Sequence, residues 1–321
     1  MRQLQAALRV LGFLALTVVG QPGVTVAQVA DDRAAIRRLV ERHFAAFARK
    51  DPEGVLACWS ADSPQFADVK DGLQTTFSSS GDIQVRDLQL SRWDLRPEGA
   101  TVRVEFALGM RRAKGRPPEF EQVIWDARFQ KKGGAWLWWE RSNPFTELAQ
   151  ALADAPDWEA RTRLLQADAK LRAPLLVNVL NRSALRAEAS GQSDRSLELN
   201  RIAIEVAKEL GDRRKLAESY SQCSEMMNRL RRTAPARING RLAARLFHDL
   251  ADRRSEAEIL SRLGQISQSS GETAEAIRDF EASRKLWHDL RETMEEAEVM
   301  DRMGEAHRAS GNPREGLAIY R

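Results

Sequence analysis

Residues 257 to 296 read AEILSRLGQISQSSGETAEAIRDFEASRKLWHDLRETMEE, and this stretch decides the fold of the C-terminal half. Its apolar residues recur at helical spacing, and the pattern is broken once at Ser270-Gly271 and again near the end. The stretch therefore predicts two helices joined by a tight turn. Because a helix hairpin of this size cannot bury its own apolar face, it needs a similar hairpin beside it.

The same pattern recurs with a period of 40 residues, as Gly271 and Gly311 illustrate. Other positions in step are Leu210, Leu250 and Leu290, then Ala217, Ala257 and Ala297, and then Glu218, Glu258 and Glu298. Small residues recur at Ser196, Ala236, Ala276 and Gly316, and at Ala203, Ala243 and Ser283, where the second helix must approach its neighbours. We expect units at 177–216, 217–256 and 257–296, and a fourth from 297 that is incomplete at residue 321, as in the front part of a longer reading frame.

These units resemble tetratricopeptide repeats (TPR). In the third unit the signature positions of that family are occupied by Leu260, Leu263, Gly264, Gly271, Ala276, Phe280 and Ser283. The six extra residues per unit resemble the lengthened form of the repeat. Two units depart from the pattern, because Arg231 replaces the turn glycine, and Asn200 and Gly240 replace the large aromatic residue of the second helix. The resemblance implies an all-α solenoid over residues 177–321 that binds other proteins.

In this family the first helices of successive repeats line the concave face, and their second, fifth, ninth and twelfth residues contact the ligand. On this sequence the resemblance assigns partner binding to Glu218, Ser221, Glu225, Asn228, Glu258, Ser261, Gln265, Gln268, Glu298, Asp301 and Glu305. The set is predominantly acidic and lacks the Lys and Arg clamp that grips a C-terminal carboxylate in some relatives. We expect a protein or peptide partner with a basic or polar segment. The alternative is that these glutamates only favour the helix and keep its surface soluble.

Residues 31 to 147 have a different pattern. Residues 32–49 form one amphipathic helix, Asp51-Pro52 starts a second helix that runs through Trp59, and a third helix spans 65–77. After residue 81 the apolar period shortens to two, which indicates half-buried strands. Turn sequences at 96–99, 114–117 and 131–134 separate four strands into a meander. This order of elements predicts an α+β domain with a four-stranded antiparallel sheet.

The order of these elements, with the Asp-Pro helix start and the final strand at 136–139, resembles the nuclear transport factor 2-like (NTF2-like, SnoaL-like) cone. In that superfamily the cone holds a small ligand or supports dimerisation, which implies a ligand-sensing or homodimerising domain. Some relatives are isomerases or dehydratases with an Asp or His base and a Tyr donor, but this domain contains no tyrosine. We expect His43 to be a packed ring on a buried helix stripe and not a base. The candidate pocket residues are His43, Trp59, Trp125 and Trp139, with core packing as the alternative.

The first 27 residues have the layout of a secretory signal peptide. Arg2 and Arg9 precede a short apolar run at 10–20, and Thr25 and Ala27 are small residues just before a cleavage site. The run of about eleven residues is shorter than the roughly 20 that a spanning helix needs, so a cleaved leader is favoured over an uncleaved anchor. We therefore expect export to the periplasm or beyond, with no membrane span after cleavage.

Charge, cysteine and histidine usage exclude several kinds of chemistry. The 50 basic and 46 acidic residues are well mixed, which argues against a nucleic-acid-binding stripe. Cys58 and Cys223 lie in different halves of the chain, so two buried thiols are favoured over a disulfide. The four histidines make no metal-ligand spacing, and no glycine-rich phosphate loop follows a strand. We expect no metal, no cofactor, no catalytic residue and no enzymatic activity within these residues.

Residues 148–176 predict a helical linker between the two domains. The run from Arg163 to Asp212 resembles the helical stretch before the first repeat of bacterial TPR proteins that carry a C-terminal CHAT (caspase-like) domain, which would lie beyond Arg321. The sequence therefore predicts an exported interaction scaffold. The alternative is a small-molecule-binding protein, or an isomerase-like or dehydratase-like enzyme, that acts in the cone.

Overall fold

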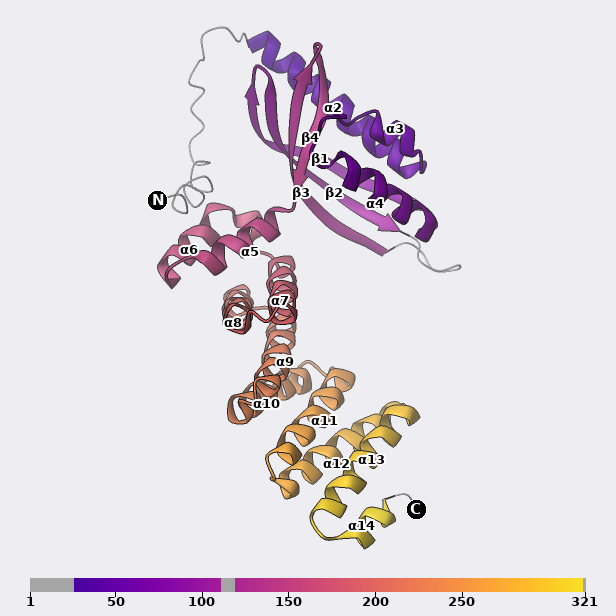
Figure 1. Ribbon diagram of the computed structural model, residues 1–321, viewed down its shortest axis with the longest axis vertical. Helices are drawn as coiled ribbons and strands as arrows, with labels where there is room; N and C mark the ends of the chain where they lie inside the picture. The colour runs from indigo at the N-terminus through magenta and orange to yellow at the C-terminus, as the bar shows by residue number, and fades with distance from the viewer. Residues whose placement is uncertain (1–25, 111–118, 320–321) are drawn as a thin grey trace. The chain divides into compact units, whose positions relative to one another are not determined.

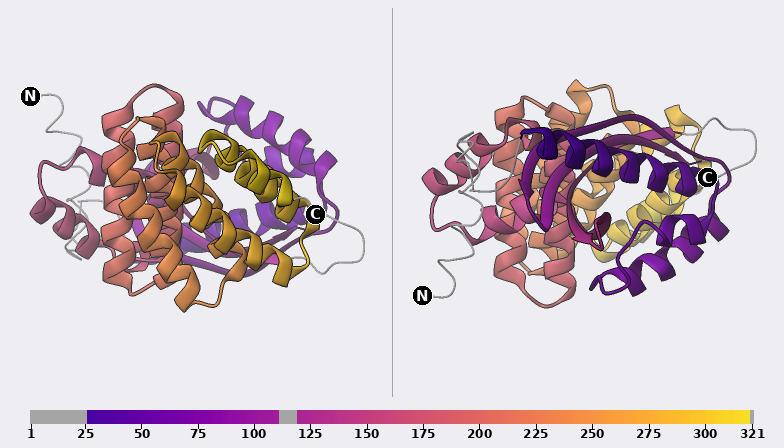
Figure 2. Two further views of the ribbon diagram at one scale, coloured as in Figure 1. Left: turned by 90° about the horizontal axis from the view of Figure 1, so that it is seen from below. Right: turned by 90° about the horizontal axis from the view of Figure 1, so that it is seen from above.

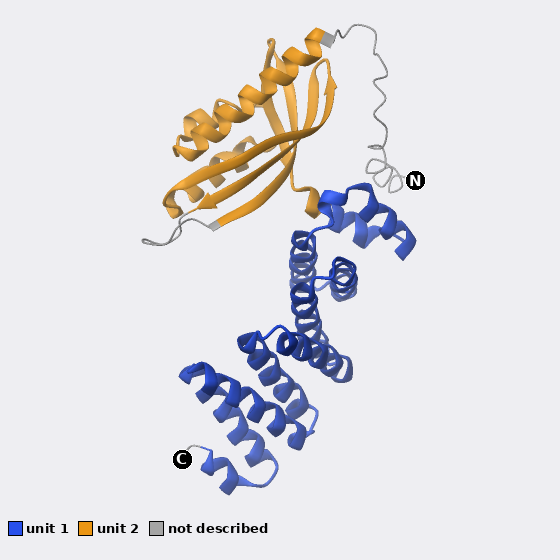
Figure 3. Ribbon diagram, turned by 180° about the vertical axis from the view of Figure 1, so that it is seen from behind, with its two compact units in different colours: residues 1–11, 148–321 blue, residues 12–147 orange. Residues whose placement is uncertain are grey.

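The computed structural model describes residues 26–110 and 119–319. The chain divides into two compact units, one ending at Glu147 and the other holding residues 148–321 (Figure 3). The leader expected at residues 1–27 lies outside the described residues, apart from Val26 and Ala27, which begin the first described helix. No helix in the described part of the chain is both long and apolar enough to cross a membrane.

The first unit combines three helices with a four-stranded sheet (Figure 1). The helices are α2 (Val26–Ala48), α3 (Pro52–Leu56) and α4 (Phe66–Ser79). The strands are β1 (Ile83–Arg96), β2 (Gly99–Met110), β3 (Glu119–Lys132) and β4 (Ala135–Ser142), all antiparallel in the order β1-β2-β3-β4. The predicted α+β meander is thus confirmed, whereas the turn expected at 114–117 lies outside the described residues.

The second helix is shorter than the sequence predicts, because α3 ends at Leu56 and not at Trp59. The backbone around Trp59 pairs with β4 instead: Trp138 N donates to Cys58 O at 2.9 Å, and Ser60 N donates to Trp138 O at 2.9 Å. These two bonds replace those that another helical turn would have supplied. They also bring the indoles of Trp59 and Trp138 into a stack with ring centroids 5.6 Å apart.

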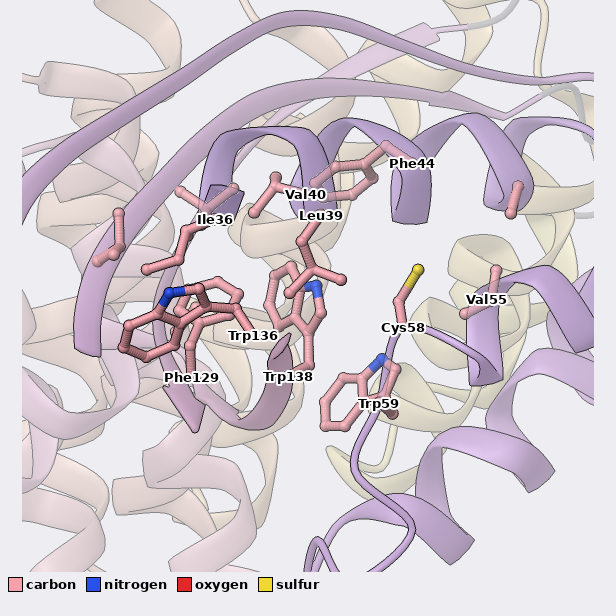
Figure 4. Packing of buried hydrophobic residues seen from close by; sticks show 14 of the residues in the cluster. Ile36, Leu39, Val40, Phe44, Val55, Cys58, Trp59, Phe129, Trp136 and Trp138 are labelled. Atoms are coloured by element: carbon pink, nitrogen blue, oxygen red, sulfur yellow. The ribbon is translucent and has the colours of Figure 1, made fainter. Parts of the chain in front are cut away.

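The core of this unit lies between α2 and the inner face of the sheet. Figure 4 shows Ile36, Leu39 and Val40 of α2 pointing toward Trp136 and Trp138, and all five side chains are buried. The period-two pattern of β2 adds Val102, Val104 and Phe106 to the same core. The helical stripe and the strand alternation therefore meet in one apolar layer.

The second unit is a run of antiparallel helix pairs, which confirms the predicted all-α solenoid (Figures 1 and 2). Where a helical linker was expected, α5 (Pro144–Asp154), α6 (Trp158–Ala167) and a short 3₁₀ turn, η1 (Ala169–Leu171), occur. The pairs are α7 (Pro174–Ala189) with α8 (Ser193–Leu210), α9 (Arg213–Arg229) with α10 (Thr233–Asp249), α11 (Arg253–Ser269) with α12 (Thr273–Leu290), and α13 (Thr293–Ala309) with α14 (Pro313–Ala318).

Two apolar clusters cross from one helix pair to the next. One cluster joins Ala217 of α9, Phe247 of α10 and Leu263 of α11. Another joins Phe280 of α12 to Met303 of α13. Since each of these clusters draws on two pairs, the pairs that contribute to them do not bury their apolar faces alone, as the repeat pattern predicted.

Local substitutions preserve the pairs that depart from the repeat signature. Arg231 takes the left-handed backbone conformation of the missing turn glycine, with φ of 58°. At the place of the missing aromatic ring, a Cβ on Gly240 would lie 2.7 Å from Leu263 Cδ2, so the leucine side chain fills that space. Asn200 is fully buried, and its Nδ2 lies 3.4 Å from Ser219 O in the next unit. The departures therefore change the packing partners without changing the architecture.

The contact between Gly264 and Phe280 gives a test of this packing. A Cβ on Gly264 would lie 2.5 Å from Phe280 Cε1, and the ring is fully buried. We predict that Gly264→Ala lowers the free energy of unfolding by about 1–2 kcal/mol, because overpacking outweighs the gain in helix propensity. In urea denaturation, the double variant with Phe280→Leu should lose less stability than the sum of the two single variants. Additive losses would show that the two residues do not compete for space.

Candidate functional site

The eleven residues that the repeat resemblance assigns to partner binding all lie on α9, α11 and α13, the first helices of three successive pairs. We name this set the first-helix face. Of the eleven, only Ser261 is buried, at 5% exposure, and the others are half-buried or exposed within the unit. Ten of the side chains are therefore accessible along the first helices of three consecutive pairs.

Two arginines on this face were missed by the sequence analysis. Arg262 donates from Nη1 to Ser221 Oγ at 3.3 Å and lies 3.6 Å from Glu225 Oε2. One unit later, Arg302 donates from Nη1 to Ser261 Oγ at 2.7 Å. Both arginines reach from one first helix to the preceding one. Their recurrence 40 residues apart was visible in the sequence, but their partners depend on how closely successive helices approach.

Salt bridges reduce the acidic character of the first-helix face. Glu218 pairs with Lys215 at 2.7 Å, three residues away on its own helix. Glu258 and Glu298 each lie 3.8 Å from an arginine four residues away. Exposed pairs of this kind contribute about 0.3–0.5 kcal/mol each. With Arg262 and Arg302 included, the face carries six carboxylates against two guanidinium groups, so it is acidic, but less so than its eleven residues alone.

A cavity of about 150 Å³ lies inside the first unit, between α2, α3, α4 and the sheet. Its apolar lining comes from Phe44, Phe47, Val55, Val69, Leu73, Phe106, Leu108 and Trp125, and its other lining residues are His43, Asp68, Gly72, Thr76 and Arg141. Since Asp68 and Gly72 of α4 are solvent-exposed, the cavity reaches the surface beside this helix. An apolar recess with a few polar groups is the usual form of a small-molecule site.

The structure brings only part of the predicted pocket together. His43 and Trp125 line the cavity. Trp59 is buried next to it, in the stack with Trp138. Trp139 is absent from the lining; its ring faces the Lys132 ammonium group at 5.6 Å. Alternation along β4 accounts for this placement, because Trp138 faces the core and the next residue faces the other side of the sheet.

His43 is 2% exposed and its ring lies 4.9 Å from that of Trp138. Burial, and then the positive charge of Arg141, lower the pKa of His43 to about 3, whereas a hydrogen bond with the Val55 backbone opposes the shift. The ring is therefore neutral near pH 7. Its Nδ1 has no hydrogen-bond partner among the described residues. A buried polar atom without a partner is rare in a protein interior.

Arg141 is a charged cavity residue that the sequence did not predict. Its guanidinium carbon lies 4.1 Å from the centroid of the Trp125 ring and 5.8 Å from that of Trp59. Burial lowers the pKa of Arg141 to about 10, so the group keeps its charge at neutral pH. The cavity therefore combines aromatic walls, a neutral imidazole and a permanent cation.

The cysteines and acidic residues of the described chain do not add a reactive centre to this list. Cys58 and Cys223 are free and buried, as the sequence predicted, and burial raises the pKa of the Cys223 thiol to about 11. Within the described residues, no group of three or more His, Cys, Asp or Glu side chains is arranged to hold a metal ion. The cavity and the first-helix face are two places in the described residues with the accessible geometry of a binding site.

No family model matches the chain, and no curated protein does. Among solved structures, BtubC (BKLC) from P. vanneervenii is 19% identical over 55% of this chain and 75% of that one, with a TM-score of 0.44. A protein of Podosopora anserina with nearly identical TPR-like repeats is 15% identical over 55% of this chain and 90% of that one, with a TM-score of 0.42. A protein of the NTF2-like family from Streptomyces avermitilis is 12% identical over 35% of this chain and 94% of that one, with a TM-score of 0.30. Likenesses at this level carry no information on function.

The buried His43 predicts a pH dependence of stability. Its pKa is 6.5 in the unfolded chain and about 3 in the folded one, so between these values the unfolded chain binds more protons. Stability is then lost as the pH falls from about 6.5 toward 3. Between pH 7 and pH 5 this ring accounts for a loss of about 2 kcal/mol. In urea denaturation between pH 7 and pH 5, the free energy of unfolding of His43→Gln should fall by about 2 kcal/mol less than that of the wild type. The same pH dependence in both proteins would contradict the lowered pKa of His43.

Proposed function

We propose that the chain is an exported interaction scaffold whose first-helix face binds an extended segment of a partner protein. The observation that carries this proposal is the accessibility of polar side chains along three successive first helices, at equivalent positions in each unit. Stacked helix pairs hold such positions in a fixed register, which suits the recognition of an extended chain. The excess of carboxylates favours a segment with basic residues.

Export to the periplasm or the medium, and association with a CHAT domain in a longer parent protein, are part of this proposal and rest on the sequence alone. The leader argument uses the layout of residues 1–27, and the CHAT argument uses a resemblance of residues 163–212. Export and partner binding are separable, because the first-helix face would bind its partner in any compartment where the two meet.

A charge reversal on the first-helix face tests this proposal. Displayed random peptides selected on the full chain would supply the ligand, whose affinity is then measured by titration. We predict that Glu218→Lys with Glu258→Lys weakens binding about tenfold, because two attractive charges become repulsive. Glu218 and Glu258 form their ion pairs within their own helices, so the variant should fold.

The matched control is Asp194→Lys with Glu281→Lys, which changes the net charge equally at exposed positions of the second helices α8 and α12. This control should keep the affinity of the wild type. Failure to select any peptide, or equal affinities for all three proteins, would contradict the proposal.

The cavity supports a second candidate function, which is the binding of a small molecule in the cone unit. The specific observation is that Arg141, a permanent cation, shares the wall of a mostly apolar cavity with the neutral ring of His43. We propose binding and not catalysis, because a histidine with a pKa of about 3 is a poor base at neutral pH. Asp68, the carboxylate in the lining, is exposed at the surface.

A further inference from the structure

Arg141 reaches the cavity because of an irregularity in the sheet. Phe129 pairs with Trp138 on the inner face, but the next residue toward the start of β3, Arg128, pairs with Glu140. Trp139 is therefore an extra residue in β4. Beyond this bulge Arg141 is opposite Ala127, which is fully buried. Without the extra residue, alternation from Trp138 would have placed Glu140 inward and Arg141 on the outer face.

Side chains from the segment before α4 hold this irregular stretch in place. Gln65 Nε2 donates to Arg141 O at 3.0 Å, and Arg141 N donates to Gln65 Oε1 at 3.0 Å. Two residues before Arg141, at the bulge itself, Ser63 Oγ donates to Trp139 O at 2.5 Å. Three hydrogen bonds thus satisfy the backbone groups of the bulge and fix the base of the Arg141 side chain. Pre-organisation of this kind reduces the entropy lost when a ligand binds.

The guanidinium group of Arg141 has no carboxylate partner among the side chains that the structure describes. The acidic residues nearest in the sheet are engaged elsewhere: Glu140 pairs with Arg128 at 2.7 Å, and Asp126 pairs with Arg103 at 2.7 Å. Asp68 also lines the cavity, but no ion pair joins it to Arg141. A cation kept in an apolar recess without a counter-ion is costly, and a bound anion would offset that cost.

The size of the cavity limits the rest of the ligand. A cavity of about 150 Å³ accepts a molecule the size of benzene. Phe44, Phe106 and Trp125 supply aromatic walls, with ring centroids 4.5 to 5.8 Å apart. Gly72 lines the cavity at its solvent-exposed side, and a Cβ there would meet no atom within 4 Å. A compact ring or a short apolar chain therefore fits, whereas a larger body would not.

We propose that the cone cavity binds a small apolar monocarboxylic acid of about the size of benzoate, with the carboxylate on Arg141 and the apolar body against Phe44, Phe106 and Trp125. This inference rests on the small-molecule function proposed for the cone. The planar guanidinium group can donate two parallel hydrogen bonds to one carboxylate, which selects carboxylates over amides and esters. The fold positions Arg141 for this role through the Trp139 bulge.

Titration of the full chain with benzoate, cyclohexanecarboxylate and benzamide tests the assignment, with tryptophan fluorescence and calorimetry as readouts. Trp125 contacts the guanidinium group, so binding should change its emission. We expect the two carboxylates to bind and benzamide to bind at least about 10-fold more weakly. Arg141→Met should weaken benzoate binding about 10- to 100-fold, the value of charge-assisted hydrogen bonds to a carboxylate.

Two further variants separate recognition from folding. Arg128→Met is the matched control, because Arg128 lies on the same strand pair, is exposed and faces the other side of the sheet. It should bind benzoate as the wild type does. Gly72→Leu should reduce binding of all three probes, because Gly72 lines the cavity where it reaches the surface and a leucine there would obstruct that opening. Arg141→Met should unfold at the same temperature as the wild type or higher, since it removes an unpaired buried charge. If this variant does not fold, Arg141→Lys replaces it, because lysine keeps the positive charge but lacks the two parallel N–H donors of the guanidinium group.

The outcomes distinguish the two levels of the proposal. Equal affinities for benzoate and benzamide, or benzoate binding unaffected by Arg141→Met, would overturn the carboxylate assignment. If benzamide then binds in a way that Gly72→Leu blocks, the small-molecule function of the cone still holds. If none of the three probes binds at about 10 mM, far above typical ligand affinities, both the assignment and that function fail.

Discussion

Close approach of neighbouring helices through small side chains is the constraint on which the solenoid depends. Ala257, Ala276 and Gly264 leave room for Phe280, and the ring then bridges α11 and α12. Because the apolar clusters cross from pair to pair, stability is shared between neighbours and does not reside in any one hairpin. The ordered display of the first helices follows from this packing, since helices held farther apart would lose both their core and their register.

The first unit places a charged side chain in the wall of its core cavity. An apolar side chain at position 141 would fill the recess without the cost of a buried charge, yet the strand is bulged so that an arginine enters. Three hydrogen bonds from Ser63 and Gln65 satisfy the bulge and keep the arginine in place. A charged residue in a cavity wall lowers the stability of the fold. Such local losses of stability are typical of ligand sites.

On the first-helix face the same side chains connect the units and present charge. Arg262 and Arg302 tie each first helix to the one before it, and in doing so they neutralise part of the acidic surface. The carboxylates at the second positions, such as Glu218 and Glu258, pair only along their own helices. They are therefore the acidic groups most available for a partner, whereas Glu225 is already held between Arg229 and Arg262. This division separates structural charges from those that can act in recognition.

Much of the architecture follows directly from local patterns. The 40-residue period, the helical spacing within it and the alternation in β2 and β3 predict a solenoid and a four-stranded meander, because apolar side chains must share a face to be buried. Asp51-Pro52 marks a helix start for an equally local reason, since the aspartate caps the Gly54 amide at 2.8 Å. The buried, free state of both cysteines also follows from their spacing and composition.

The tertiary structure alone decides what enters the cavity and which charges are paired. One extra residue in β4 inverts the alternation after Trp138, and nothing in a run of tryptophans indicates where a strand will bulge. The early end of α3 likewise depends on a bridge to a strand about 80 residues away. The partners of Arg262 and Arg302 depend on the distance between successive helices. Local periodicity specifies which face of an element is apolar, whereas register and spacing between distant elements arise only when those faces pack together.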